Sequence, residues 1–522
     1  MKVGILDILC LPSRRLADPA YHRIMTKQYS SITPQAIAVW CRQLGHETFY
    51  ANYYGIGDPR SRIPQDLDFL FVSTYTQPAA LAYALARLYG KTGTTTVIGG
   101  AHARSFPADC LRFFDYVVRD CDQELIADLL AGRFDPGHVV SSAKPYDDVP
   151  TAEERLPEIR ASSFMGGKRQ VFTTTVPMLA SMGCPYACDF CVDWNTPYRA
   201  LPLDRLVEDL RFLSENLPGA MLGFHDPNFA VKFDPVLDAL ETVPPASRLP
   251  YLIESSLSTL KATRLARLKS THCAVVAPGI ESWVDYSNKA GVGRNGTGMD
   301  KVEKLVEHFQ RIAEVVPYQQ ANFMIGLDSD EGREPIELTK EFISRAPFVW
   351  PAINVPIPFG GTPLFDSWRA EGRIHAAMPF AFYYSPYLVT TFKNYDPIRF
   401  YEMLIELTSH LSSRTLLLRR LQSAPPFLAR TVHAARTIGA WRDVNTYRRM
   451  LGMLKADRSF LDFHEGRSRV LPDFYRREFD RLLGPYAALL TQADRTPDLE
   501  QDCPGMGAPS FSAPLDRLSA AG

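Results

Sequence analysis

The sequence lacks the features that mark membrane-spanning, secreted and nucleic-acid-binding chains. No apolar run approaches the roughly 20 residues that a helix needs to cross a bilayer. The opening stretch, MKVGILDILCLPSRR, is apolar only briefly and carries no small-residue cleavage site. The net charge is −1, so no overall positive surplus predicts binding to nucleic acid or to an anionic membrane. An apolar fraction of 46% is typical of soluble globular proteins, and a cytoplasmic location is expected.

Cysteine is sparse and unevenly placed, which limits the roles it can have. Six of the nine cysteines are scattered and are predicted to be reduced, buried thiols: Cys10, Cys41, Cys110, Cys121, Cys273 and Cys503. The other three stand in SMGCPYACDFCVDW, with the spacing C-x3-C-x2-C. Zinc sites usually take four ligands, and disulfide frameworks take an even number of cysteines. Three thiolates on a short loop suit neither, but they suit a [4Fe-4S] cluster with one open iron.

Residues 1–145 alternate short apolar runs with helical patterns. Strands are predicted in KVGILDIL, ETFYAN, LDFLFVST, TTVIGG and FDYVVRD, and helices in TPQAIAVWCRQLGH, QPAALAYALARLYGKTG and QELIADLLAG. Thr33 is the predicted cap of the first of these helices. The alternation predicts a doubly wound α/β domain, flavodoxin-like or Rossmann-like, which binds ligands beyond the carboxyl ends of its strands.

The rest of the chain divides by composition. Residues 146–169 are Pro-rich and polar and are interpreted as a linker. Six strand-like runs with helical stretches between them predict a (β/α)6 partial barrel over residues 170–395, with its site at the carboxyl ends of the strands. Residues 396–495 are expected to form a helical region, and the Pro/Gly/Ser-rich tail 496–522 is expected to be disordered.

The cysteine stretch, placed after the first strand of a six-strand β/α domain, resembles the radical S-adenosylmethionine (SAM) superfamily. The resemblance implies that SAM binds the open iron of a [4Fe-4S] cluster. The reduced cluster then cleaves a C–S bond of SAM to give a 5′-deoxyadenosyl radical, with an electron from a reductant such as flavodoxin or ferredoxin. Phe190 matches the aromatic residue that packs near the adenine, although core packing is an alternative role. The implied cluster ligands are Cys184, Cys188 and Cys191.

Later strand ends carry further matches. Asp226 in GFHDPNF stands where the superfamily places polar groups near the methionyl amine. Glu281 in PGIES, followed by Lys289 and Gly291, resembles a later strand-end motif, and Gly326 in NFMIGLDSD resembles the strand-five motif. The resemblance implies that Asp226, Glu281 and Gly326 contact SAM. A lone acid at a strand end is otherwise typical of a helix cap or a solvated group.

The first domain resembles the cobalamin (B12)-binding domain that precedes many radical SAM enzymes. The stretch VIGGAHARSFPADCLRFFDYVVRDCDQE carries most of this resemblance. It implies that Ser73, Gly99 and Gly100 line the nucleotide tail of cobalamin, because glycine lets the backbone approach a bulky ligand. His102 could contact the ligand or be a solvated loop histidine. The D-x-H-x-x-G motif, whose histidine ligates cobalt from below, is absent.

Two kinds of radical chemistry remain open from the sequence. The first is a cobalamin-dependent C-methyltransferase, in which methylcobalamin donates a methyl group to a carbon radical on a small molecule, natural product or lipid. The second is a cobalamin-free enzyme that performs cyclisation, oxidation or rearrangement. An RNA methylthiotransferase would need a second cluster from Cys10, Cys41 and Cys110, but Cys41 lies within a predicted helix and no RNA-binding module is visible, so no nucleic-acid partner is expected. The cysteine triplet argues against a non-catalytic cobalamin-binding regulator.

The C-terminal helical region mixes arginine with large apolar residues, as in SSRTLLLRRLQSAPPFLARTVHAARTIGAW. We expect these helices to close the barrel, with their apolar sides buried and their arginines solvated. The alternative is a peripheral contact with an anionic membrane surface, in which Arg419 and Arg420 take part.

Overall fold

A computed structural model gives the structure of the chain. It describes all residues except 13–29, 146–147, 166–167, 170–174, 195, 230, 232, 285–295, 424–425 and 505–522, and it describes the backbone alone for 164–165 and 168–169. Lys289 and Gly291 lie outside the described residues.

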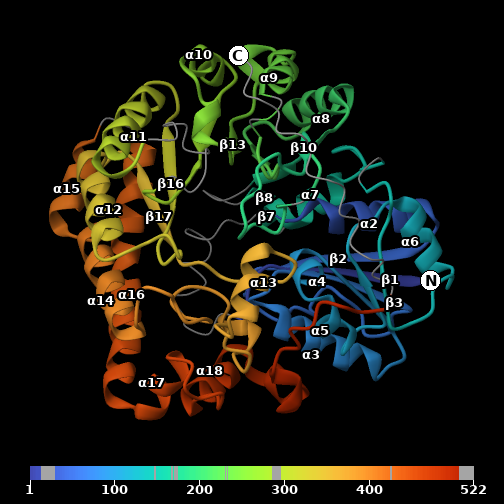
Figure 1. Cartoon of the computed structure of the whole chain (residues 1–522). Helices are drawn as coiled ribbons and strands as arrows, with labels where there is room; N and C mark the ends of the chain where they lie inside the picture. The colour runs from blue at the N-terminus through green and yellow to red at the C-terminus, as the bar shows by residue number, and fades with distance from the viewer. Residues whose placement is uncertain are drawn as a thin grey trace.

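The N-terminal part is a six-stranded parallel sheet with helices on both faces (Figure 1). The strand order is β2-β1-β3-β4-β5-β6, so it reverses between β1 and β3, the switch point at which such sheets bind ligands. Neighbouring β3 residues Phe71 and Val72 belong to two separate apolar clusters, which α2 and α6 cover on one face and α3 and α5 on the other. The strands are β1 (Lys2–Ile8), β2 (Glu47–Tyr53), β3 (Phe69–Thr74), β4 (Thr95–Gly99), β5 (Tyr116–Val118) and β6 (His138–Val140), and the helices are α2 (Ile32–Gln43), α3 (Ala79–Gly90), α4 (Ala101–Ser105), α5 (Pro107–Leu111) and α6 (Gln123–Leu130).

Two local details differ from the sequence prediction. The short strand β6 and the helices α4 and α5 were not predicted. The predicted cap Thr33 lies inside α2, which begins after Ser31. The Ser31 amide donates to the Asp7 carboxylate at 2.9 Å, so the end of β1 and the start of α2 are joined at the switch point.

The second sheet is an open barrel. Six parallel strands follow one another in chain order, β9-β12-β13-β14-β16-β17. The short strand β15 follows β14 after Pro278 and also pairs with β16. The strands are β9 (Thr175–Met178), β12 (Met221–Phe224), β13 (Tyr251–Ile253), β14 (Cys273–Val276), β15 (Gly279–Glu281), β16 (Tyr318–Met324) and β17 (Trp350–Asn354), and the intervening helices are α8 (Leu203–Asn216), α9 (Phe233–Glu241), α10 (Ala262–Ser270), α11 (Gly298–Ala313), α12 (Glu334–Arg345) and α13 (Pro363–Ala370). The predicted six βα units are therefore present.

The segment interpreted as a linker is partly helical and buried, which corrects that interpretation. It contains α7 (Leu156–Ser163), and Glu158 in this helix forms an ion pair with Arg42 of α2. Arg155 is 2% exposed and donates to Gln35 at 2.8 Å. Residues 148–163 thus join the two sheets by packing against them, a contact between distant parts of the chain that local composition does not reveal.

The C-terminal helices pack against the barrel. Arg436 of α16 donates to the Tyr318 hydroxyl at 2.7 Å, so α16 lies at the amino-terminal ends of the last two barrel strands, the end opposite the predicted site. The expectation that these helices close the barrel is consistent with this packing. The helices are α14 (Pro397–Leu411), α15 (Arg414–Gln422), α16 (Phe427–Ala456), α17 (Arg458–His464) and α18 (Asp473–Leu483). No helix within the described ranges is long and apolar enough to cross a membrane.

Residues 496–504 are ordered, although we expected them to belong to a disordered tail. The backbone amide of Asp498 donates to the Asp109 carboxylate at 2.6 Å, and that of Val139 in β6 donates to the Pro504 carbonyl at 2.9 Å. The segment is fixed by these contacts with the N-terminal sheet, so its polar composition misled the prediction.

Candidate functional site

The three predicted cluster ligands lie on one compact loop at the carboxyl end of the first barrel strand. The loop leaves the short strand β10 (Ser181–Met182), which pairs with β11 (Arg199–Ala200). The Cys184 amide donates to the Thr196 carbonyl at 3.2 Å, and the Cys191 amide donates to the Cys188 carbonyl at 3.0 Å. Gly183 has a φ of 67°, and a Cβ there would lie 2.2 Å from the Pro197 carbonyl oxygen. Only glycine allows this closure, so the local sequence fixes the loop.

The chemistry of this loop fits an iron–sulfur cluster, although the sulfur atoms do not form a ready-made metal site. Three cysteines on one short loop are the donors that such clusters use, and three leave one iron open to a further ligand. Among the residues that the structure describes, no three His, Cys, Asp or Glu side chains are arranged so that they could hold a metal ion. Phe190, which precedes the third cysteine, is half-buried and packs against the largest apolar core.

Side-chain hydrogen bonds join the cysteine loop to two other parts of the fold. Arg104, in the short helix after β4, donates to Asp193 of the loop at 3.0 Å and to Asp120 after β5 at 2.7 Å. Trp194 donates its indole N–H to the Gly361 carbonyl at 2.8 Å. The loop is therefore joined both to the N-terminal sheet and to the segment that enters α13.

Asp226 lies at the end of β12 and contacts the base of this loop. It is 2% exposed, and its carboxylate accepts from the Ser181 hydroxyl at 2.6 Å and from the Ala180 amide at 3.1 Å. Burial raises the pKa of Asp226 to about 6. Its described contacts position the start of the cysteine loop, which is a different role from the predicted contact with SAM.

Glu281 ends β15 in an unusual conformation. Its φ is 66°, in the left-handed region that a non-glycine residue seldom adopts, and the residue is 8% exposed. Such local strain persists only where the surroundings impose it, and it is concentrated at functional sites. The strand-end position predicted for Glu281 therefore coincides with a strained backbone.

The side-chain position of Gly326 is closed by packing in the core. Its φ is 103°, and a Cβ there would lie 3.0 Å from the Phe400 ring of α14 and 3.1 Å from the Phe392 ring. The backbone amide of Gly326 donates to Asp330 at 2.8 Å. The two rings come from a region outside the motif, and the contact of Gly326 with SAM stays a prediction.

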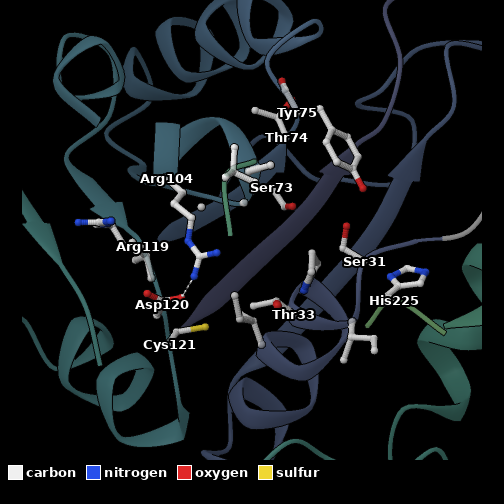
Figure 2. A pocket seen from close by; sticks show the side chains of 18 of the residues that line it. Ser31, Thr33, Ser73, Thr74, Tyr75, Arg104, Arg119, Asp120, Cys121 and His225 are labelled. Carbon is white, nitrogen blue, oxygen red and sulfur yellow. Dashed lines mark hydrogen bonds and ion pairs between the residues drawn. The ribbon is translucent and has the colours of Figure 1, made fainter. Parts of the chain in front are cut away.

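A cavity of about 320 Å³ lies between the N-terminal sheet and the cysteine loop (Figure 2). Its walls come from the carboxyl ends of β3 and β4, the start of α2, the cysteine loop and the end of β12. In Figure 2, Ser31, Ser73 and Arg104 surround this space, and His225 reaches it from the barrel. The cavity thus lies at the switch point of the first sheet, where the fold predicts a ligand.

Three of the residues predicted to line a cobalamin tail lie in this wall: Ser73, Gly99 and Gly100. Gly100 has φ 89° and ψ −172°, a conformation that is essentially restricted to glycine. A Cβ at Gly100 would lie 3.0 Å from the Ser73 hydroxyl and 3.1 Å from backbone atoms of Thr74. Backbone atoms of Gly100 and Thr74 are therefore closely packed in this wall of the cavity.

His102 does not line the cavity, which corrects the prediction that it contacts cobalamin or solvent. Its ring is fully buried, with Nε2 2.6 Å from the Tyr83 hydroxyl and Nδ1 3.3 Å from the Thr76 hydroxyl. Tyr83 also donates to Asp109 at 2.5 Å. Burial lowers the pKa of His102 to about 3, so the ring is neutral. The short helix α4 turns the side chain into the core, and sequence spacing alone did not reveal that helix.

The cysteines required for an RNA methylthiotransferase are not brought together. Cys41 lies in the apolar cluster under α2, and Cys110 lies in the cluster on the opposite face of the sheet. Burial raises the pKa of Cys41 to about 12 and that of Cys10 to about 11, so both remain protonated thiols. A second cluster at these positions is excluded by the sheet between them.

Sequence reasoning missed Arg104 and the cavity residues Ser31, Thr33, Tyr75 and His225. These side chains come from four separate segments, and none is one of the residues that the motifs singled out. Ser31, at the start of a helix beside a predicted strand end, carried the one usable signal, since parallel α/β sheets bind ligands at that edge.

Comparisons with known proteins agree with this architecture. No protein-family model matches the sequence. The chain is 24% identical to bacteriochlorophyllide d C-8(2)-methyltransferase of Chlorobaculum tepidum over 376 residues, which is 68% of this chain and 80% of the relative. It is 21% identical to bacteriochlorophyllide d C-12(1)-methyltransferase of the same organism over 324 residues, which is 60% of this chain and 68% of the relative.

Solved structures share the fold. The radical S-adenosylmethionine methyltransferase TsrM from Kitasatospora setae, with cobalamin and a [4Fe-4S] cluster bound, superposes with a TM-score of 0.53 at 13% identity, covering 85% of this chain and 99% of that one. TsrM with tryptophan substrate and a SAM analogue bound gives a TM-score of 0.50 at 15% identity, covering 72% of this chain and 77% of that one.

The fold and site together define a class: a doubly wound N-terminal sheet facing an open (β/α)6 barrel that carries a three-cysteine loop. The TsrM structures share this architecture, and the sequence is similar to the two bacteriochlorophyllide methyltransferases. The predicted fold class is confirmed.

Proposed function

We propose that the protein is a cobalamin-dependent radical SAM methyltransferase that converts a C–H bond of a small-molecule, natural-product or lipid substrate into a C–CH3 bond. The observation that carries this proposal is the single cavity of about 320 Å³, whose walls come from both the switch point of the N-terminal sheet and the cysteine loop. Both curated relatives are methyltransferases by name, and the TsrM structures hold cobalamin, a [4Fe-4S] cluster and a SAM analogue.

Different residues of the chain are proposed to bind the cofactors and to position the parts of the site. Cys184, Cys188 and Cys191 would hold the cluster, which would supply the electron for SAM cleavage, and the cavity would hold cobalamin, which would carry the methyl group. Gly100 lets the end of β4 pack closely against Ser73 and Thr74 in the cavity wall, and Arg104 joins this wall to the cysteine loop.

Asp226 and Glu281 are proposed to act in different ways. Asp226 holds the base of the cysteine loop, so Asp226→Ala should reduce the iron content after anaerobic reconstitution. Glu281, on its strained strand end, is proposed to bind SAM, so Glu281→Ala should weaken SAM binding and leave the iron content unchanged. Equal iron loss in both variants, measured by iron and sulfide assay, would show that both residues support the fold alone.

The electron is proposed to come from a flavodoxin or ferredoxin. A peripheral contact with a membrane is a separate proposal, and it rests on the surface of the C-terminal helices.

Cobalamin binding and product analysis test the proposed function. The protein is purified without oxygen, reconstituted with iron and sulfide, and incubated with hydroxocobalamin. We expect one cobalamin bound per chain, with the absorbance spectrum of a cobalamin that has no lower histidine ligand. The reason is that none of the described residues lining the cavity belongs to a D-x-H-x-x-G pattern. SAM cleavage to 5′-deoxyadenosine without retained cobalamin would instead assign the protein to cobalamin-free radical chemistry.

A further inference from the structure

The outer surface of α15 and α16 carries an unusual concentration of exposed apolar side chains. Twelve large apolar residues are exposed by more than a third in the described part of the chain, and six of them fall between residues 418 and 441. Phe427 is the most exposed of all, at 76%. We call these six residues the α15–α16 patch: Leu418, Leu421, Phe427, Leu428, Ile438 and Trp441.

The patch spans two helices that lie side by side, since α15 runs along α16. Trp441 donates its indole N–H to the Ser412 carbonyl just before α15, at 2.6 Å, and Arg430 donates to the Leu421 carbonyl at 3.3 Å, near the end of α15. At 3.6 residues per turn, Phe427, Ile438 and Trp441 fall within about 60° of one another around α16. The exposed leucines of α15 therefore lie beside an apolar stripe of α16.

The charge of this region is strongly positive. Residues 414–456 contain nine basic residues and one acidic residue, although the whole chain has a net charge of −1. Arg414, Arg419 and Arg442 are exposed around the apolar residues. Arg420 is fully buried instead, donating to the Leu411 carbonyl at 2.8 Å, which corrects its predicted place at the surface.

We propose that the α15–α16 patch binds an anionic membrane surface. Exposed aromatic and aliphatic side chains flanked by arginines are the features of helices that lie in the headgroup boundary, where apolar side chains enter the lipid and basic ones meet acidic headgroups. Solvent-exposed apolar residues in such number are otherwise unfavourable on a protein surface. The positive charge selects an anionic surface over a neutral one.

The position of the patch leaves the proposed active site accessible. α16 contacts the amino-terminal ends of β16 and β17, whereas the cavity lies at the carboxyl ends of the strands, next to the N-terminal sheet. In Figure 1, α15 lies at the left edge, on the side away from that sheet. A membrane contact through this patch is therefore independent of the proposed cofactor binding, so the failure of one proposal does not imply failure of the other.

Co-sedimentation with vesicles tests the proposal. The full chain is mixed with vesicles of phosphatidylcholine alone or with added phosphatidylserine, at low salt and at higher salt, where the screening length falls below about 10 Å. Binding to the phosphatidylserine vesicles alone, decreasing with salt, is expected. The double substitution Phe427→Gln and Leu428→Gln should weaken binding at least tenfold. Arg419→Glu alone should also weaken vesicle binding at low salt, relative to the parent.

Val470→Gln is the matched control, because Val470 is 68% exposed and lies outside the patch. It should bind vesicles like the parent. All variants should keep the parent melting temperature and iron content, since the changed side chains are at the surface. Absent binding, equal binding to neutral vesicles, or binding unaffected by the Phe427 and Leu428 changes would overturn the proposal. A dimer in the parent that these changes dissociate would overturn it in favour of a second copy of the chain.

Discussion

Gly99 and Gly100 form a natural matched pair for testing the cavity wall. Gly100→Ala places a Cβ 3.0 Å from the Ser73 hydroxyl and 3.1 Å from two backbone atoms of Thr74, and it forces alanine into a conformation that glycine alone adopts readily. A residue held in that region costs on the order of 1–3 kcal/mol. A middle value of about 2 kcal/mol corresponds to roughly a 30-fold shift toward a rearranged wall. Gly99→Ala meets the Val118 carbonyl at 3.5 Å, an ordinary contact, and should cost under about 0.5 kcal/mol.

The assay for this pair measures thermal stability and cobalamin affinity. Gly100→Ala should melt earlier than the parent and bind hydroxocobalamin on the order of ten times more weakly or worse, since the strand end moves into the ligand space. Gly99→Ala should keep the parent melting temperature, which controls for the added methyl group. If Gly100→Ala matches the parent in both measurements, the close packing inferred for this wall is wrong. Equal losses in the two variants would mean that the cavity tolerates no added volume and that backbone strain is not the cause.

Three further predictions follow from contacts already described. Replacing any one cluster cysteine with alanine should remove most reconstituted iron and abolish SAM cleavage, and full iron retention in the triple variant would refute the assignment. Arg104→Gln and Asp193→Asn should each lower cobalamin retention and SAM cleavage several-fold, which corresponds to about 0.5–1.5 kcal/mol. The double variant should be no worse than either single variant. Additive losses would show that the two residues do not act as a unit. The contribution of His102 to stability should fall as the pH drops below about 6.5, because His102 has a pKa of about 3 when folded and about 6.5 when unfolded, so the unfolded chain binds more protons at this residue between these values. Thermal melts from about pH 7 to about pH 4 should show a smaller loss for His102→Gln than for the parent.

The strands and the loop chemistry could be predicted because they depend on local sequence. β1, KVGILDI, is buried along most of its length on both faces, and residues 3–6 accordingly form an uninterrupted run without polar side chains. The three cysteines lie within eight residues, so their spacing alone places them on one loop. Patterns of this kind are independent of the rest of the fold.

The errors concern residues whose environment is set by distant parts of the chain. Arg420 is buried against the aromatic ring of Trp350, which lies 70 positions earlier. His102 is neutral in a network with Tyr83 because a short unpredicted helix turns it inward. No window of local sequence contains such contacts, so composition and spacing assign these residues to the surface or to a ligand.

The contact of residues 496–504 with the N-terminal sheet has a consequence for the order of events during synthesis. The first sheet gains its last strand, β6, by residue 140, but the Pro504 carbonyl that accepts from Val139 is made only after a further 364 residues. At about 5–20 residues per second, roughly 20–70 s separate the two on the ribosome. During that interval the Asp109 carboxylate lacks its contact with Asp498, and the edge beside β6 is uncovered. The N-terminal sheet therefore reaches its final set of contacts only when the end of the chain has been made.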